Sequence, residues 1–233
     1  MLRALVQLFH DARRRLRWSY GSGLSYWEER ADRLGALAVM HRGHPPERMG
    51  AVTEELKRRL FPLLACELTG HERMALDFGC GAGRFTADLA RTIRGRAVGV
   101  DPVAGLLQLA PHAEGVEFRP VVDGAVPLAT GAADVVFIVQ VLGAITGALP
   151  LARVRAELDR ALARDGLLFL VENTTAHPPT RSFRLRRTRV RVRSAAEYRA
   201  LLDFVDLKVV GGYEDLGETF SVMAGRRPEG VGR

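Results

Sequence analysis

Residues 74–85, Met-Ala-Leu-Asp-Phe-Gly-Cys-Gly-Ala-Gly-Arg-Phe, combine an acid with three glycines. Asp77 ends an apolar run that is typical of a buried strand, and Gly79, Gly81 and Gly83 follow at every second position. Glycine accepts a positive φ and lets the backbone approach a ligand where a Cβ would collide. The pattern therefore predicts a strand, a turn and a helix start that bind a nucleotide cofactor. The Asp77 carboxylate would repel a pyrophosphate but hold a cationic ammonium group.

The even spacing of the glycines separates two kinds of nucleotide site. The dinucleotide-binding fingerprint places its third glycine three residues after the second, whereas Gly83 follows Gly81 by two. The stretch resembles the first motif of the class I S-adenosylmethionine (SAM) methyltransferases, in which an acid precedes a GxGxG turn. The resemblance implies SAM as the cofactor and Gly79, Gly81 and Gly83 among the residues that bind it.

Further acids follow the glycine turn in the order that this family shows. Asp101 ends the apolar-leaning run 96–100, at about the interval that places an acid beside a ribose. Pro102 follows it and would give the adenine an apolar wall. A third apolar run ends at Asp123 and Gly124, where a carboxylate is placed to accept a hydrogen bond from the adenine amine.

Two more apolar runs complete the region of resemblance, which extends from Met74 to Glu172. Residues 133–139 are typical of a buried parallel strand, and Gln140, which follows them, is expected to contact the cofactor. Residues 165–172 predict a fifth strand, entered through a glycine turn after a helical segment.

The resemblance implies an α/β fold of three layers, α-β-α, around a seven-stranded, mostly parallel sheet with one antiparallel strand. A chain of 233 residues, 47% of them hydrophobic, is long enough for one such core. We expect a helical N-terminal appendage at 1–70 and a Rossmann-like SAM-binding domain at 71–226. In this family the appendage commonly lies over the cofactor. Trp27 and Arg30 of its helix are expected to contact SAM, the arginine through the methionine carboxylate.

The composition argues against membrane, disulfide-stabilised and metal proteins. No run approaches the roughly 20 apolar residues of a membrane span, and the first residues lack the small-residue cleavage site of a signal peptide. We therefore expect a cytoplasmic protein. Cys66 and Cys80 have neither a disulfide-framework nor a metal-type spacing, so we predict no metal.

The net charge of +7 is concentrated in two segments. Residues 1–18 are arginine-rich, and seven arginines between 181 and 193 have no acid among them. Strict alternation at 187–193 predicts an extended segment with four arginines on one face. We interpret this face as a contact for an anionic part of the acceptor. It is also compatible with a sheet-edge or homodimer surface.

Methyl transfer from a sulfonium mainly requires alignment of the reacting atoms, so a general base is optional. Glu172 and His177 are the candidate catalytic groups, because they lie at the end of the last predicted parallel strand and after it. The N-terminal appendage adds further candidates near the expected pocket, which are Tyr20, Tyr26, His41 and His44. Many relatives carry a histidine shortly after the fourth strand, where this chain has Gly143-Ala144-Ile145. The obvious base is therefore missing.

The leading hypothesis is a SAM-dependent methyltransferase acting on an O or N atom of a small, natural-product-type molecule. One alternative is an RNA or DNA methyltransferase, whose substrate phosphates the arginines would neutralise. Residues 140–142 read Gln-Val-Leu and not the Asn/Asp-Pro-Pro-aromatic tetrapeptide of base-amine methyltransferases, which disfavours a nucleic-acid acceptor. Another alternative is a SAM-binding protein without catalysis.

Overall fold

The structure of the chain, a computed structural model, describes residues 23–41, 43–176, 181–185 and 188–228. The strands in it are β1 (Met74–Phe78), β2 (Arg96–Asp101), β3 (Val116–Pro120), β4 (Ala133–Val139), β5 (Leu162–Asn173), β6 (Arg181–Leu185), β7 (Thr188–Val192), β8 (Lys208–Asp215) and β9 (Glu218–Arg226). The helices are α2 (Gly23–Leu34), α3 (Met49–Glu67), α4 (Thr86–Thr92), α5 (Ala104–Leu107), α6 (Ala148–Ala161) and α7 (Ala195–Leu201). Three short 3-10 helices accompany them, η1 (Gly35–Val39), η2 (Pro46–Arg48) and η3 (Leu142–Ala144).

Seven of these strands form one sheet in the order β3-β2-β1-β4-β5-β9-β8. The five strands from β3 to β5 are parallel, and β9 runs antiparallel to both β5 and β8. The predicted sheet with a single antiparallel strand is confirmed. Because β1 pairs with β2 on one side and β4 on the other, the strand order reverses there, and such a reversal opens a crevice at the carboxyl ends of the strands.

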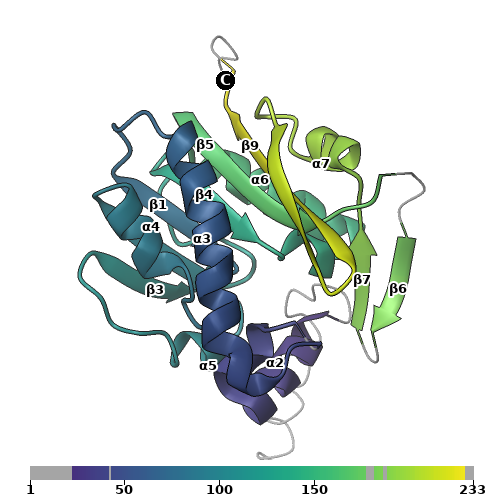
Figure 1. Cartoon of the computed structure of the whole chain (residues 1–233). Helices are drawn as coiled ribbons and strands as arrows, with labels where there is room; N and C mark the ends of the chain where they lie inside the picture. The colour runs from purple at the N-terminus through teal and green to yellow at the C-terminus, as the bar shows by residue number, and fades with distance from the viewer. Residues whose placement is uncertain (1–22, 42, 177–180, 186–187, 229–233) are drawn as a thin grey trace, which may run out of the picture.

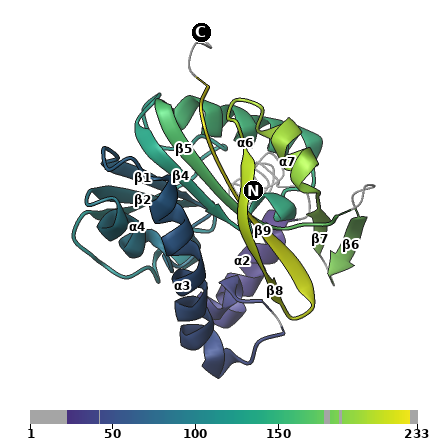
Figure 2. The same cartoon turned by 45° about the horizontal axis from the view of Figure 1, so that its top comes forward.

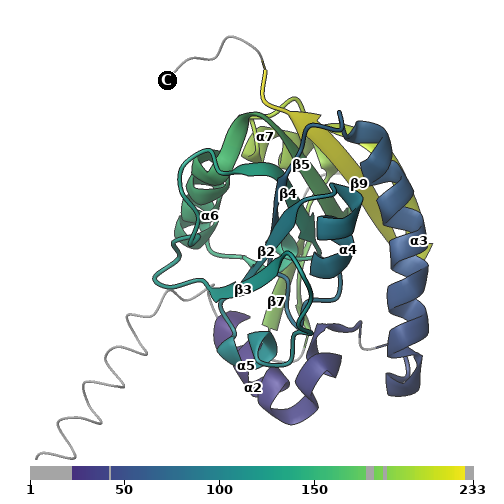
Figure 3. The same ribbon diagram turned by 90° about the vertical axis from the view of Figure 1, so that its left-hand side faces the viewer.

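Helices cover both faces of the sheet, which confirms the predicted three layers (Figure 3). Successive residues of a strand point to opposite faces, and β1 illustrates this. Leu76 belongs to the core under α6 and α7, whereas Ala75 belongs to the core under α3 and α4. Residues 133–139 form β4 with the predicted bounds, and β4 is buried from both sides.

The N-terminal helices differ in where they pack. α3 lies along one face of the sheet and buries Leu56, Leu60 and Leu64 against it (Figure 1). α2 and η1 lie instead at the carboxyl ends of the strands, where Ala31 and Ala38 pack with residues of α5 and the loop before it. They cover the crevice. The division of the chain at residue 70 stays a prediction.

The arginine-rich segment forms a two-stranded ribbon, β6-β7, which stands apart from the seven-stranded sheet (Figure 2). β7 ends at Val192, and Arg193 follows as a buried residue. The predicted alternation therefore does not place Arg193 on the arginine face. The side chains of Arg187 and Arg189 lie outside the described residues. No helix in the described part of the chain is long and apolar enough to cross a membrane.

Candidate functional site

A cavity of about 400 Å³ opens at the carboxyl ends of β1, β2, β4 and β5, under α2 and η1. It brings together most of the residues that the sequence pattern indicated. Those that line it are Trp27, Arg30, Asp77, Gly79, Gly81, Asp101, Pro102, Gln140 and Glu172. Segments far apart in the chain thus meet at one edge of the sheet.

The glycine turn forms the floor of this cavity. Gly79 and Gly81 have φ angles of 75° and 55°, a region that side chains with a Cβ rarely adopt. The amides of Gly79 and Cys80 both donate to the Val100 carbonyl, at 2.8 and 3.1 Å, which ties the turn to β2. A Cβ on Gly79 would collide with the Val141 side chain. Only glycine fits at this position.

Gly83, Asp123 and Gly124 do not line the cavity. Gly83 has a φ of 73°, and a Cβ there would lie 2.6 Å from Cζ of Phe118, so its smallness serves packing against β3. Asp123 is exposed in the loop after β3, and the nearby Val121 lines the cavity instead. The cofactor contacts predicted for these three residues stay predictions.

Two buried carboxylates stand beside the turn. Oδ2 of Asp101 accepts from the Gly81 amide at 3.0 Å, and Oδ1 accepts from the Val103 amide at 2.8 Å. Oδ2 of Asp77 accepts from the Thr86 hydroxyl at 2.7 Å. Burial raises the pKa of Asp77 to about 7 and that of Asp101 to about 6, although these hydrogen bonds oppose the shift.

Glu172 ends β5 on the opposite wall. Its carboxylate accepts from the amides of Val141 (2.8 Å), Leu142 (2.6 Å) and Gly143 (3.2 Å). Burial raises the pKa of Glu172 to about 7 against these three bonds. Because the carboxylate is engaged with the backbone, the geometry favours a positioning role for Glu172 over the predicted catalytic one.

Gln140 begins the turn after β4 with a φ of 58°. Its Nε2 donates to the Tyr213 hydroxyl at 3.4 Å. Gln140 is exposed and lines the cavity. The positive φ turns the chain sharply at the edge of the sheet, which brings the following residues over the glycine turn.

Comparison with known proteins identifies this arrangement. Residues 76–170 match the family model described as a methyltransferase domain. Malonyl-[acyl-carrier protein] O-methyltransferase of Legionella pneumophila is 32% identical over 170 residues, which are 71% of this chain and 56% of that protein. The chain thus spans little more than half the length of this relative. Residues 76–170 thus carry a methyltransferase domain, and the similarity supports a class I SAM-dependent methyltransferase.

Solved structures agree with this fold. The 1,6-didemethyltoxoflavin-N1-methyltransferase of Burkholderia thailandensis superimposes with a TM-score of 0.61 at 21% identity, over 87% of this chain and 88% of its own. A SAM-dependent methyltransferase from Methanosarcina mazei gives 0.59 at 17% identity, over 72% and 98%.

Arg30, a predicted cofactor contact, is buried and ties α2 to residues 38–40, which cover the cavity with it. Its Nε donates to the Ala38 carbonyl at 2.6 Å and its Nη2 to the Met40 carbonyl at 2.9 Å. Trp27, one turn earlier on α2, is half-buried at the cavity. Both residues thus lie at the cavity, and their contact with SAM stays a prediction. Tyr20 and His177 lie outside the described residues.

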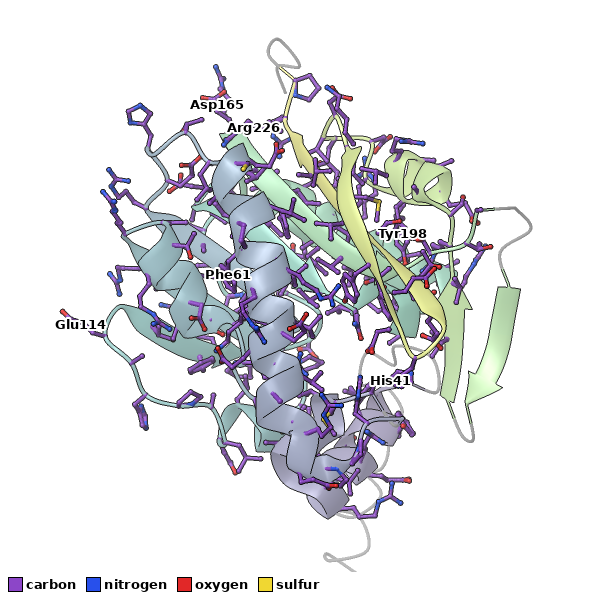
Figure 4. All side chains as sticks on the ribbon, in the orientation of Figure 1. His41, Phe61, Glu114, Asp165, Tyr198 and Arg226 are labelled. Carbon is purple, nitrogen blue, oxygen red and sulfur yellow. The ribbon has the colours of Figure 1, made fainter. Side chains whose placement is uncertain are left out.

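Several lining residues escaped the sequence analysis. Arg84, next to the last glycine, donates to the Val39 carbonyl at 3.3 Å. Asn173, Glu218 and Phe220 come from the end of β5 and from β9, which carry no motif. Of these, only Arg84 had a sequence signal, its place beside the glycine turn. His41, a predicted candidate of the appendage, does line the cavity; it lies beneath the tip of the β8–β9 hairpin (Figure 4), with Nε2 3.9 Å from Oε1 of Glu218.

The described residues contain no group of three or more His, Cys, Asp or Glu side chains arranged to hold a metal ion. Cys80 is buried among carboxylates, and burial raises the pKa of its thiol far above its ordinary value. A thiol that stays protonated is a poor nucleophile. Cys80 is therefore best explained as a small residue that fills the turn.

Proposed function

We propose that the chain transfers the methyl group of SAM to an O or N atom of a small-molecule acceptor. The observation that carries this proposal is the convergence of Asp77, the glycine turn and Asp101 on one covered cavity. The acceptor-facing wall of the same cavity supplies polar and apolar side chains from β5 and β9.

The site fits SAM in chemistry and shape. Asp101 stands where a carboxylate would accept hydrogen bonds from ribose hydroxyls, and Pro102 and Val103 give the adenine an apolar wall. Asp77 offers a buried negative charge to a cationic amino group. When bound, SAM supplies an electrophilic methyl group on a sulfonium. The chain's own task is to align that group with the acceptor and to exclude water.

His41 and Glu218 are the titratable pair on the acceptor side. The Gly43 amide donates to Nδ1 of His41 at 3.1 Å, so the neutral ring carries its proton on Nε2, which faces Glu218. His41 is therefore able to donate a hydrogen bond to the molecule that receives the methyl group. Glu218 is able to take a proton from that molecule. A hydroxyl substrate would profit from Glu218 as a base, whereas a carboxylate or neutral amine needs none.

The relatives suggest which acceptors to test first. The Legionella protein is named as an O-methyltransferase for a malonyl thioester, and the Burkholderia protein as an N1-methyltransferase for a heterocycle. The basic segment 181–193 favours an anionic acceptor, because a carboxylate would be attracted to its charge. Cover by α2 and η1 favours a small acceptor group over a nucleic acid.

The decisive experiment is in two parts. Calorimetry should detect binding of SAM and of S-adenosylhomocysteine, and no comparable binding of NAD. Purified chain with methyl-labelled SAM should then label one member of a panel that includes malonyl thioesters, aromatic acids and nitrogen heterocycles. A chain without affinity for SAM or its product would overturn the proposal. If RNA alone were labelled, the result would favour the alternative of a nucleic-acid methyltransferase.

A further inference from the structure

Residues Val141–Ile145 form a turn between β4 and α6 that two buried charged side chains hold from opposite ends. Glu172, 2% exposed, accepts from the amides of residues 141–143. Arg193, 3% exposed, donates from Nη1 to the Leu142 carbonyl at 2.9 Å and from Nη2 to the Ile145 carbonyl at 3.2 Å. The carboxylate thus takes the donors of the turn, and the guanidinium takes its acceptors.

Two buried charges are an expensive way to stabilise a core. Burial of an ionised group costs free energy unless hydrogen bonds compensate it, and replacing buried charges by apolar side chains is often neutral or stabilising. A Cβ on Gly143 would lie 3.1 Å from Oε2 of Glu172, so the close approach depends on a glycine. The arrangement is therefore better explained by what it places than by the stability it adds.

The turn lines the cavity and contacts two of its neighbours, the glycine turn and β7. On one side the Val141 side chain occupies the space beside Gly79 of the glycine turn. On the other side Gly143 approaches β7, where the carbonyl of Arg191 would lie 3.5 Å from a Cβ on Gly143. Gly143, Ala144 and Ile145 themselves line the cavity. A shift of this turn would therefore move part of the cavity wall beside the glycine turn.

We propose that Arg193 is a positioning residue that fixes, together with Glu172, the Val141–Ile145 turn for methyl transfer. This inference rests on the proposed function. Arg193 does not line the cavity and acts through the turn. Misplacement of reacting groups by about 1 Å can cost about 100-fold in rate. A side chain that fixes the position of this turn therefore affects the rate of methyl transfer.

Arg193→Met tests the inference, because it keeps an unbranched apolar stem and removes both donors and the charge. Arg193→Lys restores the charge and one donor. Arg160→Met is the matched control, since Arg160 also donates to two carbonyls, those of Leu128 (2.7 Å) and Val126 (2.8 Å), but does not line the cavity. Its loss should lower stability without touching the turn.

Two readouts are measured for each variant, amide hydrogen exchange of residues 139–147 and affinity for S-adenosylhomocysteine. For Arg193→Met we expect about ten-fold faster exchange confined to the turn, in keeping with the loss of a charged hydrogen bond. Affinity should fall several-fold, because Val141 no longer packs steadily over Gly79. Arg193→Lys should recover part of both, and Arg160→Met should change neither.

Unchanged exchange and affinity in Arg193→Met would overturn the inference, as would equal losses in Arg160→Met. If Arg193→Met does not fold, Arg193→Lys decides by the same two readouts. A wild-type chain that fails to bind S-adenosylhomocysteine would instead refute the proposed function, while the exchange data would still test the clamp on the turn.

Discussion

A Cβ on Gly81 would lie 2.5 Å from Cγ1 of Val39, so the N-terminal cover rests directly on the glycine turn. The contact is held from both sides, because Arg30 of the cover and Arg84 of the turn each donate to carbonyls of residues 38–40. A displacement of the glycine turn would therefore also displace residues 38–40, which cover the cavity.

Gly81→Ala should reduce affinity for S-adenosylhomocysteine by at least about ten-fold. The new methyl group would push Val39 away, and the φ of 55° would add about 1 kcal/mol of strain. Calorimetry measures the loss. Gly131→Ala is the control, because Gly131 has a φ of 67° but no atom within 4 Å of its Cβ position. Equal loss of affinity in the control would show that backbone strain alone explains the effect.

Asp101→Asn should weaken binding of S-adenosylhomocysteine by about ten-fold or more, because hydrogen bonds to a charged group are worth about 1.5–3 kcal/mol. Asp123→Asn should have a much smaller effect, since Asp123 is exposed and does not line the cavity. Titration calorimetry of both variants separates the two acids. A large loss in Asp123→Asn would restore its predicted contact with the adenine amine.

The ligand-free chain should lose stability as the pH rises from about 4 to 7. Burial raises the pKa of Asp77 and Glu172 to about 7 and that of Asp101 to about 6, above the ordinary values of 3.8 for aspartate and 4.5 for glutamate. In this window the folded chain keeps protons that the unfolded chain has released, so the free energy of unfolding falls with pH and levels off above it.

Urea denaturation across this range measures the slope, and Asp77→Asn should reduce it. Glu72 affects the pH dependence of stability in the opposite direction, because its pKa is lowered. Burial would raise this pKa, but hydrogen bonds from Thr69 and Arg226 lower it to about 2. Its contribution is therefore lost only below about pH 4.5. Stability that rises between pH 5 and about 7 would contradict the expected sign.

Tyr198→Phe should leave the free energy of unfolding unchanged or raise it by about 1 kcal/mol. The Tyr198 hydroxyl is buried beside Glu172 and Arg193, but it makes no hydrogen bond of normal geometry among the described residues. Its removal therefore costs no bond and relieves a desolvated group. Thermal and urea unfolding test this, with Tyr213→Phe as the control, because the Tyr213 hydroxyl accepts from Gln140. A loss of more than about 1 kcal/mol in Tyr198→Phe would reveal a partner for the hydroxyl.

Arg189→Gln combined with Arg191→Gln should weaken acceptor binding and leave SAM affinity nearly unchanged. The reason is charge, because the Arg191 side chain is partly exposed on β7 and lies 3.8 Å from its nearest carboxylate, that of Glu197. Separate titrations with SAM and with the labelled acceptor measure the two affinities. Equal loss of both would assign the ribbon a structural role.

The predictions that succeeded rest on short stretches of consecutive residues. The apolar run before Asp77 and the alternate glycines after it determine a strand and a turn through local backbone preferences. The order of apolar runs likewise identified the parallel strands, and the family resemblance implied the three layers. Asp123 shows the limit of this reasoning, because the pattern indicates an Asp-Gly turn but does not say whether its carboxylate lines the cavity.

What the sequence determined by itself is therefore the floor of the site, because strand, turn and helix start depend on neighbours along the chain. Only the tertiary structure decided its walls and lid. Val39 contacts Gly81, and Glu218 lies near His41. Arg193 donates hydrogen bonds to the turn at 142–145. About 40 to 180 residues of sequence separate these partners. Such contacts follow no period, since they depend on how the sheet brings separate loops to one edge.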